Sequence, residues 1–235
     1  MSALISQHAL YLIFENPEHI PKPFYQQKKI HLLCVDTIHT QQIQQLTSKL
    51  NKRFAERHAQ HGAFVIVYGR GIFIRGKSGA GKSQLLLNLI KNNHLWVADD
   101  LTNFYLNTQG QIIGEADNNL SEYIHIKGVG PIHVDKTYGQ ACRIRSHSLA
   151  AAIHLSDNIP QENPHISAYS QLDTLTLLNK KLPLWHFSSS NHNLPLLVEQ
   201  CAKNLILEAW GHNAADGLEN ALNNALSRAQ NNDSK

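Results

Sequence analysis

The feature that most constrains this chain is one glycine-rich stretch, Gly76-Lys77-Ser78-Gly79-Ala80-Gly81-Lys82-Ser83. Its spacing, G-x-x-x-x-G-K-S, is that of a phosphate-binding P-loop. Apolar runs at 63–67 and 71–74 precede the stretch, and a pattern typical of a helix follows at 84–91. A strand, a glycine-rich turn and a helix start, in that order, distinguish a P-loop from an ordinary glycine-rich turn, which is the alternative.

The chemistry of this loop follows from its residues. Glycines allow the backbone to turn so that several N–H groups point inward, and the N-terminus of the next helix adds partial positive charge where an anion sits. Lys82 can then reach the β- and γ-phosphates of a nucleotide, and the Ser83 hydroxyl can bind Mg²⁺. We therefore predict that all eight residues form a nucleotide site: Gly76, Lys77, Ser78, Gly79, Ala80, Gly81, Lys82 and Ser83.

Two adjacent acids follow the next apolar run, at 95–98. A strand that ends in Asp99 and Asp100 soon after a P-loop helix delivers carboxylates beside the bound phosphates, as a metal-binding acidic site requires. A solvated strand end is the alternative interpretation. Two neighbouring acids in this position favour the functional one.

Composition sets limits on the class of protein. The 235 residues suffice for one sizeable α/β core with a small appendage, and a net charge of +3 with scattered basic residues does not indicate a nucleic-acid surface. The fifteen histidines show no metal-cage spacing. Three well-separated cysteines, Cys34, Cys142 and Cys201, suggest buried, reduced thiols, and the chain shows neither a signal peptide nor a membrane span. We therefore expect a cytoplasmic protein.

Periodicity predicts two parts. Strands at 4–14 and 30–35 and a helix at 40–58 form a small N-terminal α/β appendage, residues 1–58. Residues 59–230 form the P-loop domain. Its strands are expected at 63–67, 71–74, 95–98, 103–106, 111–113, 124–134, 149–155, 172–178 and 182–187, and two C-terminal helices at 194–210 and 213–226. The predicted fold is α/β, with a mixed, partly antiparallel sheet around the P-loop.

Several stretches together resemble one family. The first, His61-Gly62, precedes the strand that leads to the P-loop. The others follow the loop in the sequence: His94-Leu95-Trp96-Val97-Ala98-Asp99-Asp100, Lys127-Gly128-Val129-Gly130, Tyr138-Gly139, Ala202-Lys203-Asn204 and Gly211-His212-Asn213-Ala214-Ala215. In this order they are similar to the C-terminal catalytic domain of HPr kinase/phosphorylase, a bacterial serine kinase that acts on a small phosphocarrier protein. The match is specific from about His61 to Val134 and weak from Ser156 to Asn193, and little of it extends before residue 45.

The resemblance implies an ATP- and Mg²⁺-dependent phosphotransferase with four catalytic residues. Asp100 corresponds to the base that accepts the serine proton, His61 lies near it, and Lys82 binds the phosphates. Asp99 helps to hold Mg²⁺ or water, although adjacent carboxylates near one metal titrate as a pair, so their division of roles stays open. For His61, a histidine that caps a strand end is the plainer alternative. The family also forms hexamers, which implies a homo-oligomer.

The chain departs from the family in several places. His125 stands where the family has a second metal-binding Glu, and imidazole is a poor ligand for Mg²⁺. Lys127 replaces an Arg, and Lys77 replaces an Asp. No Arg occurs between Arg145 and Arg228, and the family's Arg-containing segment is replaced by Trp185-His186-Phe187-Ser188-Ser189-Ser190-Asn191. We therefore predict that the reverse, phosphorolytic reaction is lost.

Three functions remain from the sequence. The first is a serine kinase that acts on a small carrier or related protein. The second is a small-molecule kinase on the same scaffold, because a fold does not fix a substrate. The third is a nucleotide-binding regulatory module without catalytic activity, which His125 and the missing arginines favour.

Overall fold

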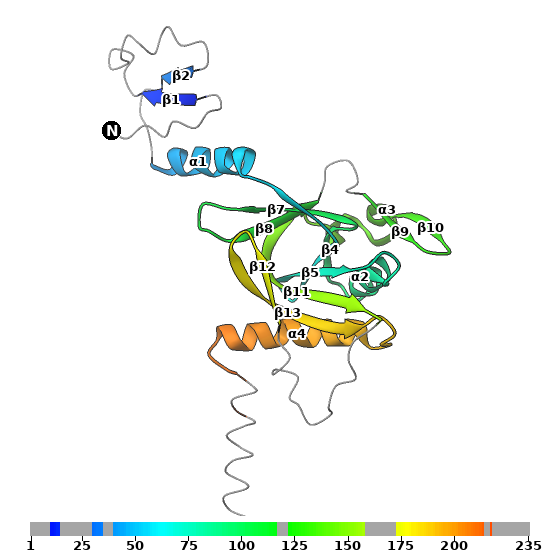
Figure 1. The fold of residues 1–235 in the computed structure, drawn as a ribbon. Helices are drawn as coiled ribbons and strands as arrows, with labels where there is room; N and C mark the ends of the chain where they lie inside the picture. Colours follow the sequence, from blue (N-terminus) through cyan, green and yellow to red (C-terminus); the bar gives the residue numbers. More distant parts are fainter. Residues whose placement is uncertain are drawn as a thin grey trace, which may run out of the picture. The chain divides into compact units, whose positions relative to one another are not determined.

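The computed structural model describes residues 10–14, 30–34, 40–116, 122–157, 173–213 and 217. The chain divides into two compact units, Met1–Phe54 and Ala55–Lys235. Helices and strands are labelled in Figure 1.

The described residues of the first unit form two strands and a helix. Strands β1 (Leu10–Phe14) and β2 (Ile30–Cys34) pair in parallel, and helix α1 spans Thr40–Phe54. The prediction that this helix reaches His58 was wrong. His58 begins strand β3, whose backbone pairs antiparallel with a strand more than forty positions later, and this long-range pairing overrides the local helical pattern.

The second unit is built on one nine-stranded sheet, in the order β3-β7-β8-β11-β5-β4-β6 with β13 and β12 beside β11. The strands are β3 (His58–His61), β4 (Ala63–Val67), β5 (Arg70–Gly76), β6 (Leu95–Ala98), β7 (Leu101–Leu106), β8 (Ile112–Ala116), β11 (Ser146–Ser156), β12 (Asp173–Leu177) and β13 (Lys180–Ser188). The first half of β11 pairs antiparallel with β8, and its second half pairs in parallel with β5 and β13. The sheet is therefore mixed, as predicted.

A separate antiparallel hairpin lies beside the P-loop helix. It consists of β9 (Tyr123–Ile126) and β10 (Gly130–His133), followed by α3 (Val134–Tyr138) and a 3₁₀ turn at Gln140–Cys142. The prediction of one strand over 124–134 was wrong. Gly128 and Gly130 adopt positive φ angles of 85° and 103°, and these angles reverse the chain between the two strands.

Helices α2 (Lys82–Lys91) and α4 (Leu194–Ala209) pack together and against β4 and β5. Apolar side chains of α2 recur at helical spacing and are buried: Leu85, Leu86, Leu89 and Ile90. They form the first core cluster with inward residues of β4, β5 and β11. The other side of these strands carries a second core cluster, in which Phe64 and Phe73 each make an edge-to-face contact with Phe104. Burial on both sides explains why every residue of β4 is apolar and buried.

Other predictions have mixed outcomes. Helix α4 closely matches the predicted helix at 194–210, whereas the second C-terminal helix, at 213–226, falls largely outside the described residues. Burial raises the pKa of the Cys201 thiol to about 12, which makes this thiol unreactive. Cys142 is only half-buried. Within the described ranges, none of the helices has the length and apolar character needed to span a membrane.

Candidate active site

The P-loop follows β5, as predicted, and its turn depends on glycine. A Cβ atom at Gly76 would lie 2.6 Å from the carbonyl oxygen of Leu155, so no larger residue fits there without a shift in the backbone. Gly79 and Gly81 have φ angles of 82° and 86°, in the left-handed region. Gly81 is the N-cap of α2, and no described side chain caps this end of the helix. Its free N–H groups and positive dipole end suit an anion.

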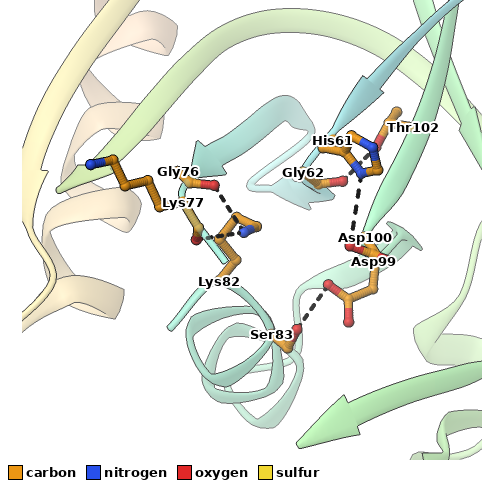
Figure 2. Close-up of polar contacts among 9 residues, drawn as sticks. All are labelled: His61, Gly62, Gly76, Lys77, Lys82, Ser83, Asp99, Asp100 and Thr102. Carbon is orange, nitrogen blue, oxygen red and sulfur yellow. Dashed lines mark hydrogen bonds and ion pairs between the residues drawn. The ribbon is translucent and has the colours of Figure 1, made fainter. Parts of the chain in front are cut away.

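Lys82 lies in the first turn of α2. Its ammonium group donates hydrogen bonds to the carbonyl oxygens of Gly76 and Lys77, both at 3.0 Å, so Nζ is held inside the curve of the loop (Figure 2). The side chain of Lys77 points away from this curve (Figure 2). Of the remaining loop side chains, Ser78 is exposed and Ala80 is buried against the first core cluster. Of the two lysines in the loop, Lys82 is thus the one placed for a bound phosphate.

Asp99 stands at the end of β6 beside α2. Its Oδ1 accepts a hydrogen bond of 3.1 Å from the Ser83 hydroxyl (Figure 2). Burial raises the pKa of Asp99, and the hydrogen bond from Ser83 opposes this shift. Because burial disfavours the ionised form of Asp99, a cation beside this carboxylate would stabilise its negative charge. The environment of Asp99 therefore favours the binding of a cation.

Asp100 and His61 lie close together because two hydrogen bonds join the segments that carry them. The link between β3 and β4 at Gly62 meets the link between β6 and β7 at Asp100, where Gly62 N donates to Asp100 O at 2.9 Å. Thr102 Oγ1 donates to Gly62 O, also at 2.9 Å, and Thr102 is fully buried. His61 Nδ1 and Asp100 Oδ1 are then 4.0 Å apart, and both side chains are about four-fifths exposed. This pair is accessible to a substrate from solvent, and its own ion-pair energy is small.

Thr102 is a positioning residue that the sequence did not reveal. A threonine in a strand is ordinary, and the hydrogen bond to Gly62 joins residues forty positions apart. Gly62 is also constrained, because a Cβ atom there would fall 2.5 Å from the Ile74 carbonyl oxygen and 2.6 Å from the Phe73 ring. No local sequence pattern indicates either constraint.

The oxygen ligands suit Mg²⁺. Ser83 Oγ and Asp99 Oδ1 are hard donors side by side, and Mg²⁺ commonly takes one or two protein oxygens together with substrate phosphates and water. Within the described ranges, no three His, Cys, Asp or Glu residues form a metal-binding group. His125 lies on β9 and is exposed to solvent. The oxygens of Ser83 and Asp99 therefore form the candidate metal site.

The chain matches the family model "HPr Serine kinase C-terminal domain" over residues 52–222. It is 29% identical to an HPr kinase/phosphorylase of Limosilactobacillus reuteri over 212 residues, which cover 88% of this chain and 65% of the relative. It is 30% identical over 201 residues to an HPr kinase/phosphorylase of Caldicellulosiruptor bescii, which cover 85% and 64%. The chain thus spans slightly less than two thirds of these relatives.

A solved structure supports the same relation. The HPr(Ser) kinase/phosphatase of Coxiella burnetii has 29% sequence identity and a TM-score of 0.58, over 65% of this chain and 98% of that one. The similarity covers a mixed α/β fold with a large mixed sheet.

Proposed function

This chain belongs to the HPr serine kinase C-terminal domain family, and we propose that it is an ATP-dependent protein serine kinase that phosphorylates a small carrier or related protein. The observation that carries this proposal is the placement of Lys82, Ser83 and Asp99 at the P-loop with Asp100 on the adjacent link. The proposed phosphate ligand, metal ligands and base thus lie on neighbouring segments of the chain.

Each residue has a role in the proposed transfer. Main-chain N–H groups of the loop and the Lys82 ammonium bind the phosphates and orient the γ-phosphoryl group. Ser83 and Asp99 would hold Mg²⁺, which would neutralise charge on the phosphates when bound. A carboxylate oxygen of Asp100 accepts the proton of the attacking serine hydroxyl as the oxygen–phosphorus bond forms, and ADP leaves. His61, with its Nδ1 4.0 Å from Asp100 Oδ1, orients this carboxylate toward the hydroxyl.

We further propose that the reverse, phosphorolytic reaction is lost. The chain has no Arg between Arg145 and Arg228, and within that interval β13 ends at Ser188, which two further serines follow. Lysine and histidine cannot replace the planar two-pronged donor that an arginine offers to a phosphate. Incubation of phosphorylated carrier protein with inorganic phosphate should release no pyrophosphate.

The alternative is a nucleotide-binding regulatory module without catalytic activity. Exposed His125 favours it, because an imidazole on β9 does not replace a metal-binding carboxylate. A small-molecule kinase on the same scaffold is a third candidate. For each of these functions, we propose that the active part is residues 59–230 and that the protein is a cytoplasmic homo-oligomer, with the hexamer of the family as its expected form.

Labelled ATP tests the proposal directly. The purified full chain is incubated with γ-labelled ATP, Mg²⁺ and small phosphocarrier proteins, and serine phosphorylation is located by mass spectrometry. We expect transfer to one serine, and omission of Mg²⁺ should abolish it. ATP binding without transfer to any protein or metabolite would favour the regulatory module. Turnover with a metabolite alone would favour the small-molecule kinase.

A further inference from the structure

Three basic side chains form a row across the parallel part of the sheet. Arg75 of β5 is in register with His154 of β11, and His154 is in register with His186 of β13. Neighbouring strands are about 4.8 Å apart, so the row spans roughly 10 Å. The two histidine rings lie 5.4 Å apart between centroids. Each residue of this row, which we call the basic row, stands one or two positions before the carboxyl end of its strand.

The basic row lies on the side of the sheet opposite α2. Side chains two residues apart on a strand point the same way. Phe73, Ala152 and Leu184 each precede a member of the row by two positions, and all three belong to the second core cluster. The first core cluster, which contains α2, takes the alternate positions such as Ile74 and Ile153. The row therefore lies on the same side of the sheet as the second core cluster, next to it toward the carboxyl ends of the strands.

A cavity of about 210 Å³ opens beside Arg75. Its polar lining comes from His58 and Gln60 of β3, Arg75, and Thr176 of β12, and its apolar lining from Phe73 and residues 175, 177 and 178. This volume is several times the roughly 30 Å³ that one water occupies in the liquid, and it is smaller than the ~300–1,000 Å³ of a typical drug-sized pocket. The cavity therefore fits a small polar ligand.

Among the described residues, a carboxylate contacts the row at one end only, at His186. Among the residues that the structure describes, the half-buried Arg75 guanidinium contacts no carboxylate. Asp173 of β12 lies against the far end, where its Oδ2 is 3.1 Å from His186 Nε2. Burial, the Arg75 charge and His186 together lower the pKa of His154. An anion at this position would offset the Arg75 charge and favour protonation of the histidine.

We propose that the basic row, of which Arg75 alone lines the cavity, binds a small oxyanion of the phosphate class, at a site separate from the P-loop. Arg75 would supply the fixed charge and planar donors, and His154 and His186 would supply N–H donors when protonated. His58 and Gln60 face the same cavity from β3. This site does not depend on the proposed kinase activity, since its residues are distinct from Lys82, Ser83, Asp99 and Asp100.

Inorganic phosphate is the probe, and the full chain is first saturated with a non-hydrolysable ATP analogue and Mg²⁺ so that the P-loop is occupied. Phosphate is then titrated at pH 6.5 while the imidazole resonances are followed by NMR, with affinity measured by calorimetry. We expect the His154 and His186 resonances to shift, and protons to be taken up on binding. His147, on the opposite half of β11, is the matched control and should not respond.

Variants decide the outcome. Arg75→Thr and His154→Gln should each weaken phosphate binding by about tenfold or more, whereas Arg75→Lys should retain part of it and His147→Gln all of it. Each variant should bind the ATP analogue as wild type does, and this control shows that the variant is folded. If Arg75→Thr does not fold, the His154→Gln result stands alone. No phosphate binding to the nucleotide-saturated chain, or equal binding by His154→Gln and wild type, would overturn the proposal. Neither result bears on phosphoryl transfer by Asp100.

Discussion

The P-loop and the basic row meet at the end of β5, where Arg75 and Gly76 are neighbours, yet they are built in different ways. The P-loop is one continuous stretch in which glycine angles, a helix N-terminus and a lysine occur together. The basic row takes one residue from each of three strands, separated by 79 and 32 positions in the chain (154 minus 75 and 186 minus 154). Local sequence therefore encodes one of the two proposed anion sites, and strand register assembles the other.

The two regions also differ in how they hold charge. Lys82 donates to two loop carbonyls at 3.0 Å, and the oxygens of Ser83 and Asp99 lie ready for a cation. The loop thus combines opposite charges, as binding of a metal–nucleotide complex requires. In the basic row, burial and the Arg75 charge disfavour protonation of His154, and the carboxylate of Asp173 contacts the row at its far end, through His186. Such an arrangement suits an anion without a metal.

The largest expected effect is on the kinase side of the comparison. Asp100→Asn keeps the size of the side chain but removes the proton acceptor, so turnover should fall by about 10²–10⁴-fold. ATP affinity should stay unchanged, because the Asp100 side chain takes no part in the hydrogen bonds of Lys82 and Ser83 at the P-loop. Steady-state kinetics and calorimetry on Asp100→Asn, with the exposed acid variant Glu208→Gln as the control, measure both quantities. Wild-type turnover in Asp100→Asn would remove this aspartate from the mechanism.

Lys82→Ala should have the next largest effect. Loss of one charge-assisted phosphate contact is worth about 1.5–3 kcal/mol, which weakens ATP binding or turnover by roughly 10–150-fold. Phosphate binding at the basic row should be unaffected, which would separate the two anion sites. Lys91→Ala, at the other end of α2, is the matched control, because its exposed side chain lies a whole helix away from the loop. Equal ATP affinity in both variants would contradict the P-loop interpretation.

The sequence predicted those parts of the site that depend on neighbours in the chain. The P-loop, helix α2 and strand β6 with its acidic end all lie where spacing and apolar periodicity placed them. The sequence did not predict β3, because His58–His61 has no apolar alternation and owes its conformation to pairing with β7. For the same reason the contacts of Gly62 and Thr102 could not be foreseen. Tertiary pairing decides them, and the local pattern does not contain it.

The contribution of that pairing is tested by Gly62→Ala. The added methyl group meets the Ile74 carbonyl oxygen and the Phe73 ring at about 2.5 Å, and overpacking of this kind typically costs about 1–3 kcal/mol of unfolding free energy. The shift should also move Asp100, whose carbonyl oxygen accepts the Gly62 hydrogen bond, and so lower turnover. Gly69→Ala is the control, because it shares a positive φ but has no atom within 4 Å of the new methyl group. Urea unfolding should show the larger loss in Gly62→Ala, and equal losses would mean that backbone angle, rather than space, limits both glycines.

The smallest effect concerns the pH dependence of stability at the basic row. The pKa of His154 is lowered from its ordinary value of 6.5 by burial, by Arg75 and by His186, so below pH 6.5 the unfolded chain binds more protons at this residue than the folded chain. This histidine therefore destabilises the fold increasingly as the pH falls below about 6.5, and the effect vanishes at higher pH. Asp173 on β12 and His58 on β3 also face this region, and they remain unchanged in a His154→Gln variant.

The melting temperatures of wild type and His154→Gln are measured as a function of pH. The two curves should run parallel above pH 7 and diverge below pH 6.5, where the variant should lose less stability. Added phosphate should reduce the acid destabilisation of wild type but not of the variant, since an anion beside Arg75 makes protonation of His154 more favourable. Parallel curves at every pH would show that the environment of His154 disfavours its charged form no more than water does. That result would contradict the excess of positive charge from which we infer that the row binds anions.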